Sequence, residues 1–541
     1  MKRDLSRLSN EQFDLLIIGG GATGCFTARD AALRGLKVAL IEKSDFAAAT
    51  SAHNSKLVHG GLRYLQNGEF GLVRESLRER RILQAIAPHL VRPLSFLLPL
   101  YGKGIGERLK LATGLTLYDL LAFDRGRLED PALRPPAHRW LRREQAVMAE
   151  PVLAGDDLEG AFAYPDAQMF MPERIALENL IDAAAHGAAL ANHLGCGKLI
   201  LREGKVIGAE ATDSVSGALV KIRARAVLLA IGPWSDLFLE HVTGRPAAHK
   251  LVRSKGIHIL VPNMTQSHAL TLQAADIKKG GGHFFVMPWR GHTLIGTTDT
   301  EFKGDPETLA VCEADVESFL STINRYLPSA KLRREDVLFA YAGLRPMVAD
   351  GAKGTYGVSR RAELVNHADE GIDGLFSALG GKWTTSRALA QTVTDAVTAK
   401  LGLKERCTTA TTPLPGGRID RFESLVKGFE KTYPGISSLR HLAHMYGARL
   451  PLLLKGAKLT DLVPLNVSGD VRAQILFSVR EEMALTLEDV VMRRTSIGQF
   501  GKPAPDLLTD LAAMMGAELG WSPARQQSEI EAVSRLYEIG P

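Results

Sequence analysis

The chain has 541 residues, 45% of them hydrophobic and 23% charged, and its formal net charge at pH 7 is +6. This length allows roughly two to four domains, and the composition is that of a soluble globular protein. The mild positive charge fits an anionic small substrate or an anionic lipid surface, and it falls well short of a nucleic-acid footprint. Four scattered cysteines indicate isolated thiols in a reducing compartment.

The sequence predicts neither a secretory signal nor a membrane-spanning helix. The first residues, MKRDLSRLSNEQ, carry positive charge, but no apolar stretch follows them. No run approaches the ~18 uncharged apolar residues that a spanning helix needs.

The segment from residue 13 to residue 43, FDLLIIGGGATGCFTARDAALRGLKVALIEK, predicts a strand, a glycine turn, a helix and a second parallel strand. Its first six residues form a short apolar run, which is typical of a strand buried on both faces. The turn carries Gly19, Gly21 and Gly24, and the helix extends from Ala22 to Arg34. The second strand ends at an acidic residue.

This pattern indicates a dinucleotide cradle. Gly19 allows the tight turn, Gly21 lets the backbone approach a pyrophosphate, and Gly24 lets helix and strand pack closely. The helix N-terminus offers free N–H groups to the phosphates. Glu42, eighteen residues after Gly24, is placed to accept hydrogen bonds from the adenosine ribose. A glutamate there argues against NADP and leaves NAD and FAD open.

Further motifs follow in order: KSDFAAATSAHNSKLVHGGLRYL, LLAIGPWSD, SKGIHILV, MPWRGHTLIGTTDTEFKGDP, YAGLRPMV, GGKWTTSRALA and PLPGG. With them the sequence resembles the FAD-dependent glycerol-3-phosphate dehydrogenases, respiratory enzymes that pass electrons to quinone. The resemblance covers most of residues 13 to 420. It implies FAD as cofactor, bound by Gly19, Gly21, Ala22, Thr23, Gly24, Glu42, Lys43, Thr50, Ser51, Ser55, Lys56, His59, Gly60, Gly61, Gly232, Gly381, Lys382 and Thr384.

The resemblance places the segment HGGLRYL against the isoalloxazine ring and the substrate. Gly60 and Gly61 would let the backbone approach the flat ring. Arg63 would present its donors to a phosphate, with Tyr64 beside it. Without the resemblance, Arg63 could equally be a solvated charge on a helix.

A second glycine turn, GLFSALGGKWTTSRALA, predicts a strand over Leu375–Leu379, a turn at Gly380–Gly381 and a helix to about Leu401. The helix N-terminus favours negative charge, which the resemblance identifies as the pyrimidine edge of the flavin. Lys382 at the turn would contact both flavin and substrate. The alternative is a glycine helix entry with an exposed lysine.

Four cations would form the substrate pocket: Arg63, Arg345, Arg360 and Lys382. Pro346 biases Arg345 toward an extended backbone. A phosphate monoester carries close to two charges and three strong acceptor oxygens, so it needs several such donors. In the family an acidic and an aromatic residue usually follow the equivalent of Arg360, whereas Arg361 and Ala362 follow here, and Ser386 replaces a usual tyrosine. These changes keep another polyol phosphate, such as a tetritol phosphate, open as the substrate.

His258 lies in GIHILV, which alternates with period two. Ile257, Ile259 and Val261 share one strand face, while His258 and Leu260 take the other. A lone histidine on a strand is more often structural, but by resemblance this one faces the substrate. We expect His258, Arg345 and Lys382 to be catalytic, with His258 accepting the hydroxyl proton and Arg345 stabilising the alkoxide. His258, Arg345, Arg360, Lys382, Arg63 and Tyr64 would bind substrate.

The expected fold class is α/β, with a Rossmann-like FAD-binding domain interleaved with an antiparallel-sheet substrate domain, plus a C-terminal helical domain. The FAD-dependent oxidoreductase would span residues 1–400. Its FAD-binding segments would be about 10–90, 165–245 and 340–400, and its substrate-domain segments about 91–164 and 246–339. A Thr-, Pro- and Gly-rich linker (401–420) and the helical domain (421–541) would follow.

The segment GIGERLKLATGLTLYDLLAF, residues 104–123, is basic at its start and apolar afterwards. It could lie on an anionic bilayer or be a buried helix of the substrate domain. The resemblance favours peripheral attachment to the cytoplasmic face of the inner membrane, and a homodimer. It implies oxidation of sn-glycerol 3-phosphate to dihydroxyacetone phosphate with quinone as acceptor. The alternatives are an oxygen-using oxidase and a non-catalytic FAD-binding protein, and no metal or nucleic acid is expected.

Overall fold

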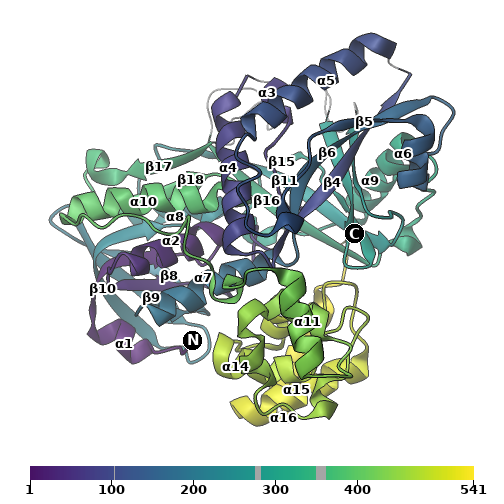
Figure 1. The fold of residues 1–541 in the computed structure, drawn as a ribbon. Coiled ribbons are helices and arrows are strands. Elements are labelled where there is room, and N and C mark those ends of the chain that lie inside the picture. The colour runs from purple at the N-terminus through teal and green to yellow at the C-terminus, as the bar shows by residue number, and fades with distance from the viewer. Residues whose placement is uncertain (67, 103, 275–281, 349–360, 541) are drawn as a thin grey trace.

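The computed structural model describes residues 1–66, 68–102, 104–274, 282–348 and 361–540. Two sheet-containing units lie side by side, and a helical C-terminal domain lies below them (Figure 1). No helix in these ranges combines the length and apolar character needed to cross a bilayer.

The first sheet is the parallel core that the N-terminal pattern predicts. Its order is β17 (Ala362–Asn366), β18 (Leu375–Gly380), β10 (Leu219–Leu229), β1 (Gln12–Ile18), β2 (Val38–Ile41) and β7 (Ala189–Ala191), with β9 (Lys205–Asp213) and β8 (Leu194–Arg202) continuing from β10. Strands β18, β10, β1, β2 and β7 run parallel. Their apolar side chains are buried on both faces of the sheet, as expected of parallel strands covered by helices.

Helices cover this sheet and leave its carboxyl edge open. α2 (Ala22–Leu33), α7 (Pro172–Ala185) and α10 (Ser386–Leu401) pack against one another on one face. α1 (Leu5–Asn10) and α8 (Ser235–Thr243) contribute to the opposite core. The two glycine turns follow β1 and β18, so both reach the edge where ligands bind in such sheets.

The second sheet is mostly antiparallel. Its order is β15 (Thr300–Phe302), β11 (Leu251–Pro262), β14 (His292–Gly296), β13 (Gly282–Trp289), β12 (Ala269–Ala274), β4 (Val91–Tyr101), β6 (Leu158–Met169) and β3 (Leu57–Val58), with β16 (Phe339–Val348) beside β11 and β5 (Arg139–Arg142) beside β6. Only the short β12–β4 contact is parallel among the described pairs. One face packs on α6 (Arg143–Ala149) and α9 (Glu313–Tyr326). Near the other face lie α3 (Arg63–Gln66), α4 (Phe70–Ile86) and α5 (Gly104–Leu121).

The fold class is confirmed. Strand β16, assigned from sequence to the FAD-binding segment 340–400, lies in the second sheet, because it pairs with β11 along its whole length. The expected linker 401–420 makes buried contacts with the first unit. Leu414 is fully buried, and the Arg29 guanidinium donates to the carbonyls of Thr412 and Pro413 at 2.8 and 3.2 Å.

The C-terminal domain is helical. It contains α11 (Phe422–Thr432), α12 (Leu439–Tyr446), α13 (Leu450–Leu454), α14 (Ala473–Glu482), a π-helix at Asp489–Arg494, α15 (Pro505–Leu519) and α16 (Pro523–Arg535). After α16 the chain returns to the second unit, where Gly540 pairs with Cys312. The N-terminus and the chain end therefore lie on different units (Figure 1).

Candidate active site

Two adjoining cavities lie where the carboxyl edge of the first sheet meets the second sheet. The smaller has a volume of about 600 Å³ and the larger about 1020 Å³. They share a wall formed by Thr50, Pro346, Gly381, Lys382 and Trp383. The two cavities are therefore direct neighbours at this wall.

The smaller cavity lies at the first glycine turn. Its lining includes Gly19, Gly21, Ala22, Thr23, Glu42, Lys43, Thr50, Ser51, Gly232, Gly381 and Lys382. Gly24 lies behind this lining, where an added Cβ would sit 1.9 Å from the Gly19 carbonyl oxygen. The turn and α2 can thus approach each other only with glycine at position 24.

Two side-chain contacts hold the cradle. The Glu42 carboxylate accepts the Gly20 N–H at 2.7 Å, and the Ser51 hydroxyl accepts the Ala22 N–H at 2.8 Å. Gly21 begins α2 without a side-chain cap, so the positive end of the helix faces the cavity. This donor set suits a pyrophosphate.

The larger cavity brings together residues that are far apart in sequence. His258 on β11, Arg345 on β16 and Lys382 at the second glycine turn all line it. Register explains part of this convergence, because Ser254 of β11 pairs with Arg345 and His258 pairs with Tyr341. The β14 residue opposite His258 is Gly296, where a Cβ would sit 2.0 Å from the imidazole. The sheet therefore needs glycine there to admit the His258 ring.

His258 is a buried, neutral imidazole. Its Nε2 lies 2.9 Å from the Ser55 hydroxyl, and its Nδ1 has no hydrogen-bond partner among the described residues. The ring stacks on Tyr341 with centroids 5.0 Å apart. Burial, followed by the positive charges of Arg345 and Lys56, holds the pKa of His258 well below its ordinary 6.5. A lowered pKa favours the neutral form, in which one ring nitrogen carries no proton.

Arg345 is held by a network of oxygen acceptors. Its guanidinium donates to the hydroxyls of Ser254 and Thr297, both at 2.9 Å, and to the Thr298 carbonyl at 2.5 Å. The Asp299 carboxylate lies 3.7 Å away. Arg345 also lines the larger cavity, so it brings a fixed positive charge to the wall of that cavity.

Lys382 and the stretch after β3 meet across the same cavity. The Lys382 ammonium lies 4.4 Å from the centre of the Tyr64 ring. The His59 N–H donates to the Thr384 hydroxyl at 3.2 Å. Gly61 lines the cavity. The Arg63 side chain and the whole of Arg360 lie outside the described residues.

Besides Gly24, two of the residues expected to contact the cofactor, Lys56 and Gly60, line neither cavity. Gly60 lines neither cavity, because its N–H donates to Asp166 and to the Tyr118 hydroxyl, both at 3.0 Å. The Lys56 ammonium also lines neither cavity. It is buried and donates to Glu173 at 3.0 Å and to the Ala52 carbonyl at 2.6 Å. Lys56 and Gly60 therefore contact the residues that pack around the cavities, not the cavities themselves.

Comparison with known proteins supplies the family. Residues 14–396 match the model for FAD dependent oxidoreductases, and residues 407–526 match the C-terminal domain of alpha-glycerophosphate oxidase. A glycerol-3-phosphate dehydrogenase from Synechocystis sp. is 35% identical, covering 99% of this chain and 98% of its own. Glycerol-3-phosphate dehydrogenase 2 from Mycobacterium tuberculosis is 34% identical, over 97% of this chain and 88% of its own.

The solved structures agree. The X-ray structure of the glycerol-3-phosphate dehydrogenase from Bacillus halodurans complexed with FAD is 27% identical, with a TM-score of 0.78 over 98% of this chain and 96% of that one. The chain belongs to the FAD-dependent glycerol-3-phosphate dehydrogenase family. FAD is its cofactor, and a glycine cradle next to a larger cavity fits an extended dinucleotide.

For this flavoprotein, sequence reasoning misses the residues behind the site. Asp166 accepts hydrogen bonds from Gly60, from the Tyr118 hydroxyl at 2.8 Å and from the Arg80 guanidinium at 2.6 Å. Thr297 and Asp299 hold Arg345. The stretch TTD directly after an apolar strand is a signal that could have revealed this second group. Nothing local marks Tyr118 or Arg80.

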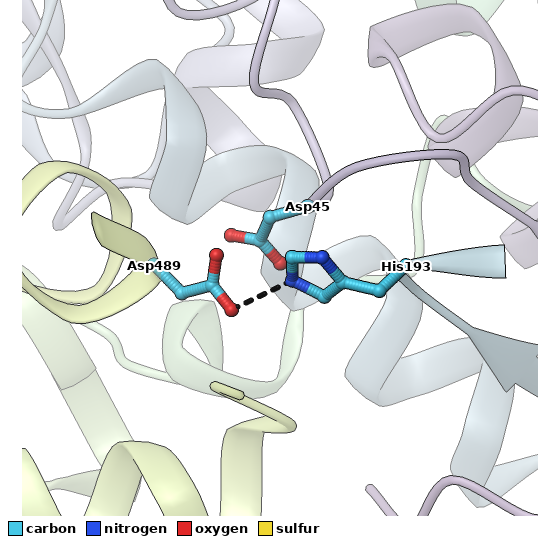
Figure 2. A group of neighbouring side chains, drawn as sticks. All are labelled: Asp45, His193 and Asp489. Carbon is cyan, nitrogen blue, oxygen red and sulfur yellow. Dashed lines mark hydrogen bonds and ion pairs between the residues drawn. The ribbon is translucent and has the colours of Figure 1, made fainter. Parts of the chain in front are cut away.

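One further cluster lies outside both cavities. Asp45, His193 and Asp489 place their ligand atoms within 4.8 Å of one another (Figure 2). However, Arg493 and Arg494 donate to Asp45, and Arg493 also donates to Asp489 at 2.8 Å. Because guanidinium groups already neutralise both carboxylates, the cluster is an ion-pair network between the C-terminal domain and the first unit.

Proposed function

We propose that this flavoprotein oxidises sn-glycerol 3-phosphate to dihydroxyacetone phosphate. The supporting observation is that a neutral, buried His258 shares a cavity with the cations Arg345 and Lys382. The adenosine and pyrophosphate of FAD would occupy the smaller cavity, with the flavin ring at the shared wall beside Gly381. When bound there, FAD supplies the hydride acceptor.

The division of labour follows from charge and protonation. Lys382 and Arg345, together with the expected contacts of Arg63 and Arg360, would bind the phosphate dianion through charge-assisted hydrogen bonds. His258 would accept the proton from the C2 hydroxyl, and the Arg345 charge would stabilise the alkoxide that develops there. Ser55, hydrogen-bonded to Nε2, would orient the imidazole.

Anaerobic mixing of holoprotein with polyol phosphates tests this assignment. We expect sn-glycerol 3-phosphate to bleach the flavin absorbance near 450 nm, and glycerol to fail because it lacks the dianion. Faster bleaching by a tetritol phosphate would identify the other substrate that Arg361 and Ala362 leave open. If no polyol phosphate bleaches the flavin, the protein is a non-catalytic FAD-binding protein.

We also propose quinone as the electron acceptor, delivered at the cytoplasmic face of the inner membrane. The larger cavity continues beneath α5 along apolar side chains that include Phe96, Leu98, Leu111 and Leu117. Only one face of α5 packs inward, through Leu115 and Tyr118. Its outer side exposes Ile105, Leu109 and Leu120, a pattern that suits an interfacial helix.

Vesicle sedimentation and acceptor assays test the membrane and quinone proposals. We expect the holoprotein to bind anionic phosphatidylglycerol vesicles, and the double variant Leu109→Glu/Leu120→Glu to lose binding. Met148→Glu, at an exposed methionine on α6, serves as the matched control. Substrate-driven quinone reduction supports the acceptor, whereas stoichiometric peroxide would make the protein an oxidase. The proposed homodimer is checked by analytical ultracentrifugation.

A further inference from the structure

The loop after β2 is bound tightly to the first glycine turn. The Glu42 carboxylate accepts the N–H groups of Gly20 and Ser44 at 2.7 and 2.9 Å, and the Ala47 N–H donates to the Gly20 carbonyl at 2.9 Å. The Phe46 ring leaves no space for a Cβ on Gly20. The position of residues 42–47 therefore fixes the geometry of the cradle.

The same loop carries a carboxylate that faces the C-terminal domain. Asp45 is fully buried. It accepts the Arg493 Nε–H at 2.7 Å, two N–H groups of Arg494 at 2.7 and 2.8 Å, and the Asn192 amide at 2.9 Å. A bidentate arginine on a buried carboxylate is the strong form of this contact. If the arginines were withdrawn, Asp45 would be left as an uncompensated buried charge.

The two arginines are themselves fixed within their own domain. Arg493 donates to Asp489 at 2.8 Å and to Glu488 at 2.6 Å, and Arg494 donates to the Glu482 carbonyl at 3.1 Å. A parallel contact runs through His193, whose Nε2 lies 2.9 Å from Asp489 (Figure 2) and whose N–H donates to the Ser44 carbonyl at 2.7 Å. The π-helix therefore contacts the cradle loop in two ways, directly through Asp45 and indirectly through His193.

We propose that the C-terminal domain acts as a cofactor-retention element, in which Arg493 and Arg494 hold Asp45 and so fix the Glu42 loop around the adenosine half of FAD. Docking of the domain and binding of FAD then favour each other, because coupling between two binding events is reciprocal. The proposal rests on the placement of adenosine at Glu42, and it holds for any substrate or electron acceptor.

Fragment affinities separate this role from a general loss of structure. The affinities of the apoprotein for FAD, ADP and FMN are measured for Asp45→Asn and for Arg494→Lys, which keeps the charge but loses the bidentate fork. We expect FAD and ADP to bind about 5- to 150-fold more weakly, the usual range of coupling between sites, while FMN affinity is unchanged. Equal losses for ADP and FMN, or no loss, would overturn the proposal.

A matched control and a second measurement complete the test. Arg480 forms an exposed bidentate pair with Glu518 in the same domain, and Arg480→Lys should leave all three affinities unchanged. In the unmodified chain, ADP should slow hydrogen–deuterium exchange at the amides of residues 489–494. An exchange rate that is the same with and without ADP would contradict the coupling. If Glu42→Gln leaves ADP affinity unchanged, the placement of adenosine fails, even where substrate still bleaches the flavin.

Discussion

The two cavities share a wall but are built in different ways. The smaller contains the first glycine turn, a local segment in which Gly24 packs closely against Gly19. The larger depends on side chains from separate elements, among them Arg345, which Ser254 and Thr297 hold by hydrogen bonds. A backbone-built site is sensitive to added atoms, whereas a side-chain-built site is sensitive to lost charge or lost hydrogen bonds.

The largest effect is expected from His258→Ala, because it removes the proposed proton acceptor without touching the cradle. Single-turnover flavin reduction by substrate should slow by ~100-fold or more, while FAD content stays normal. Since the pKa of His258 is lowered, its titration should leave the wild-type rate unchanged between pH 6 and 8. His249→Ala, at a half-buried histidine paired with Glu363, is the control. Unchanged reduction would remove His258 from the mechanism.

Arg345→Gln should act on substrate and leave the cofactor in place. Loss of charge-assisted hydrogen bonds worth about 1.5–3 kcal/mol corresponds to an apparent substrate affinity that is roughly 10- to 100-fold weaker. Steady-state kinetics and FAD titration measure the two effects separately. Arg139→Gln, at an exposed arginine on β5, should change neither. Equal loss of FAD and substrate binding would contradict the separation of the two cavities.

Gly24→Ala should weaken the binding of FAD and act on the cradle rather than on the substrate pocket. Its Cβ would meet the Gly19 carbonyl oxygen, and overpacking of this kind costs about 1–3 kcal/mol, so FAD affinity should fall about tenfold or more. The ratio of absorbance at 450 to 280 nm reports the loss. Gly428→Ala in α11, where the added Cβ has open space, should retain full colour. If Gly24→Ala binds FAD with normal affinity, the backbone of the glycine turn must shift to make room for the added Cβ, and the prediction is wrong.

The smallest effect concerns pH at the ion-pair network. Burial and the nearby charge of Arg493 lower the pKa of His193. The hydrogen bond to Asp489 and the negative charges of Asp489 and Asp45 raise it by more. The net effect is a pKa above the ordinary 6.5. The resulting stabilisation is fully present below pH 6.5 and is lost as pH rises through the raised value. Glu529 also interacts with this histidine. The melting-temperature difference between wild type and His193→Gln should therefore shrink as pH rises.

The sequence predicts the two regions unequally for a physical reason. Strand, turn, helix and acidic end of the cradle are contiguous, so local patterns predict these elements and the part of the lining that they supply. The larger cavity depends on strand register across the second sheet, as in the pairing of Ser254 with Arg345. The resemblance identifies the residues that converge there. Residue type alone does not predict that Lys56 donates a hydrogen bond to Glu173, or that the Gly60 N–H donates to Asp166. Side-chain partners are chosen by tertiary packing.

The contacts of Asp45 with Arg493 and Arg494 span 448 and 449 residues of chain. At about 5–20 residues per second, a ribosome takes roughly 20 to 90 s to cover that distance. Throughout this interval the nascent chain already contains the first glycine turn and Asp45. It does not yet contain Arg493 and Arg494, which form ion pairs with Asp45. We therefore expect any flavin captured early to be held reversibly, and firm loading to wait until Arg493 and Arg494 have been synthesised.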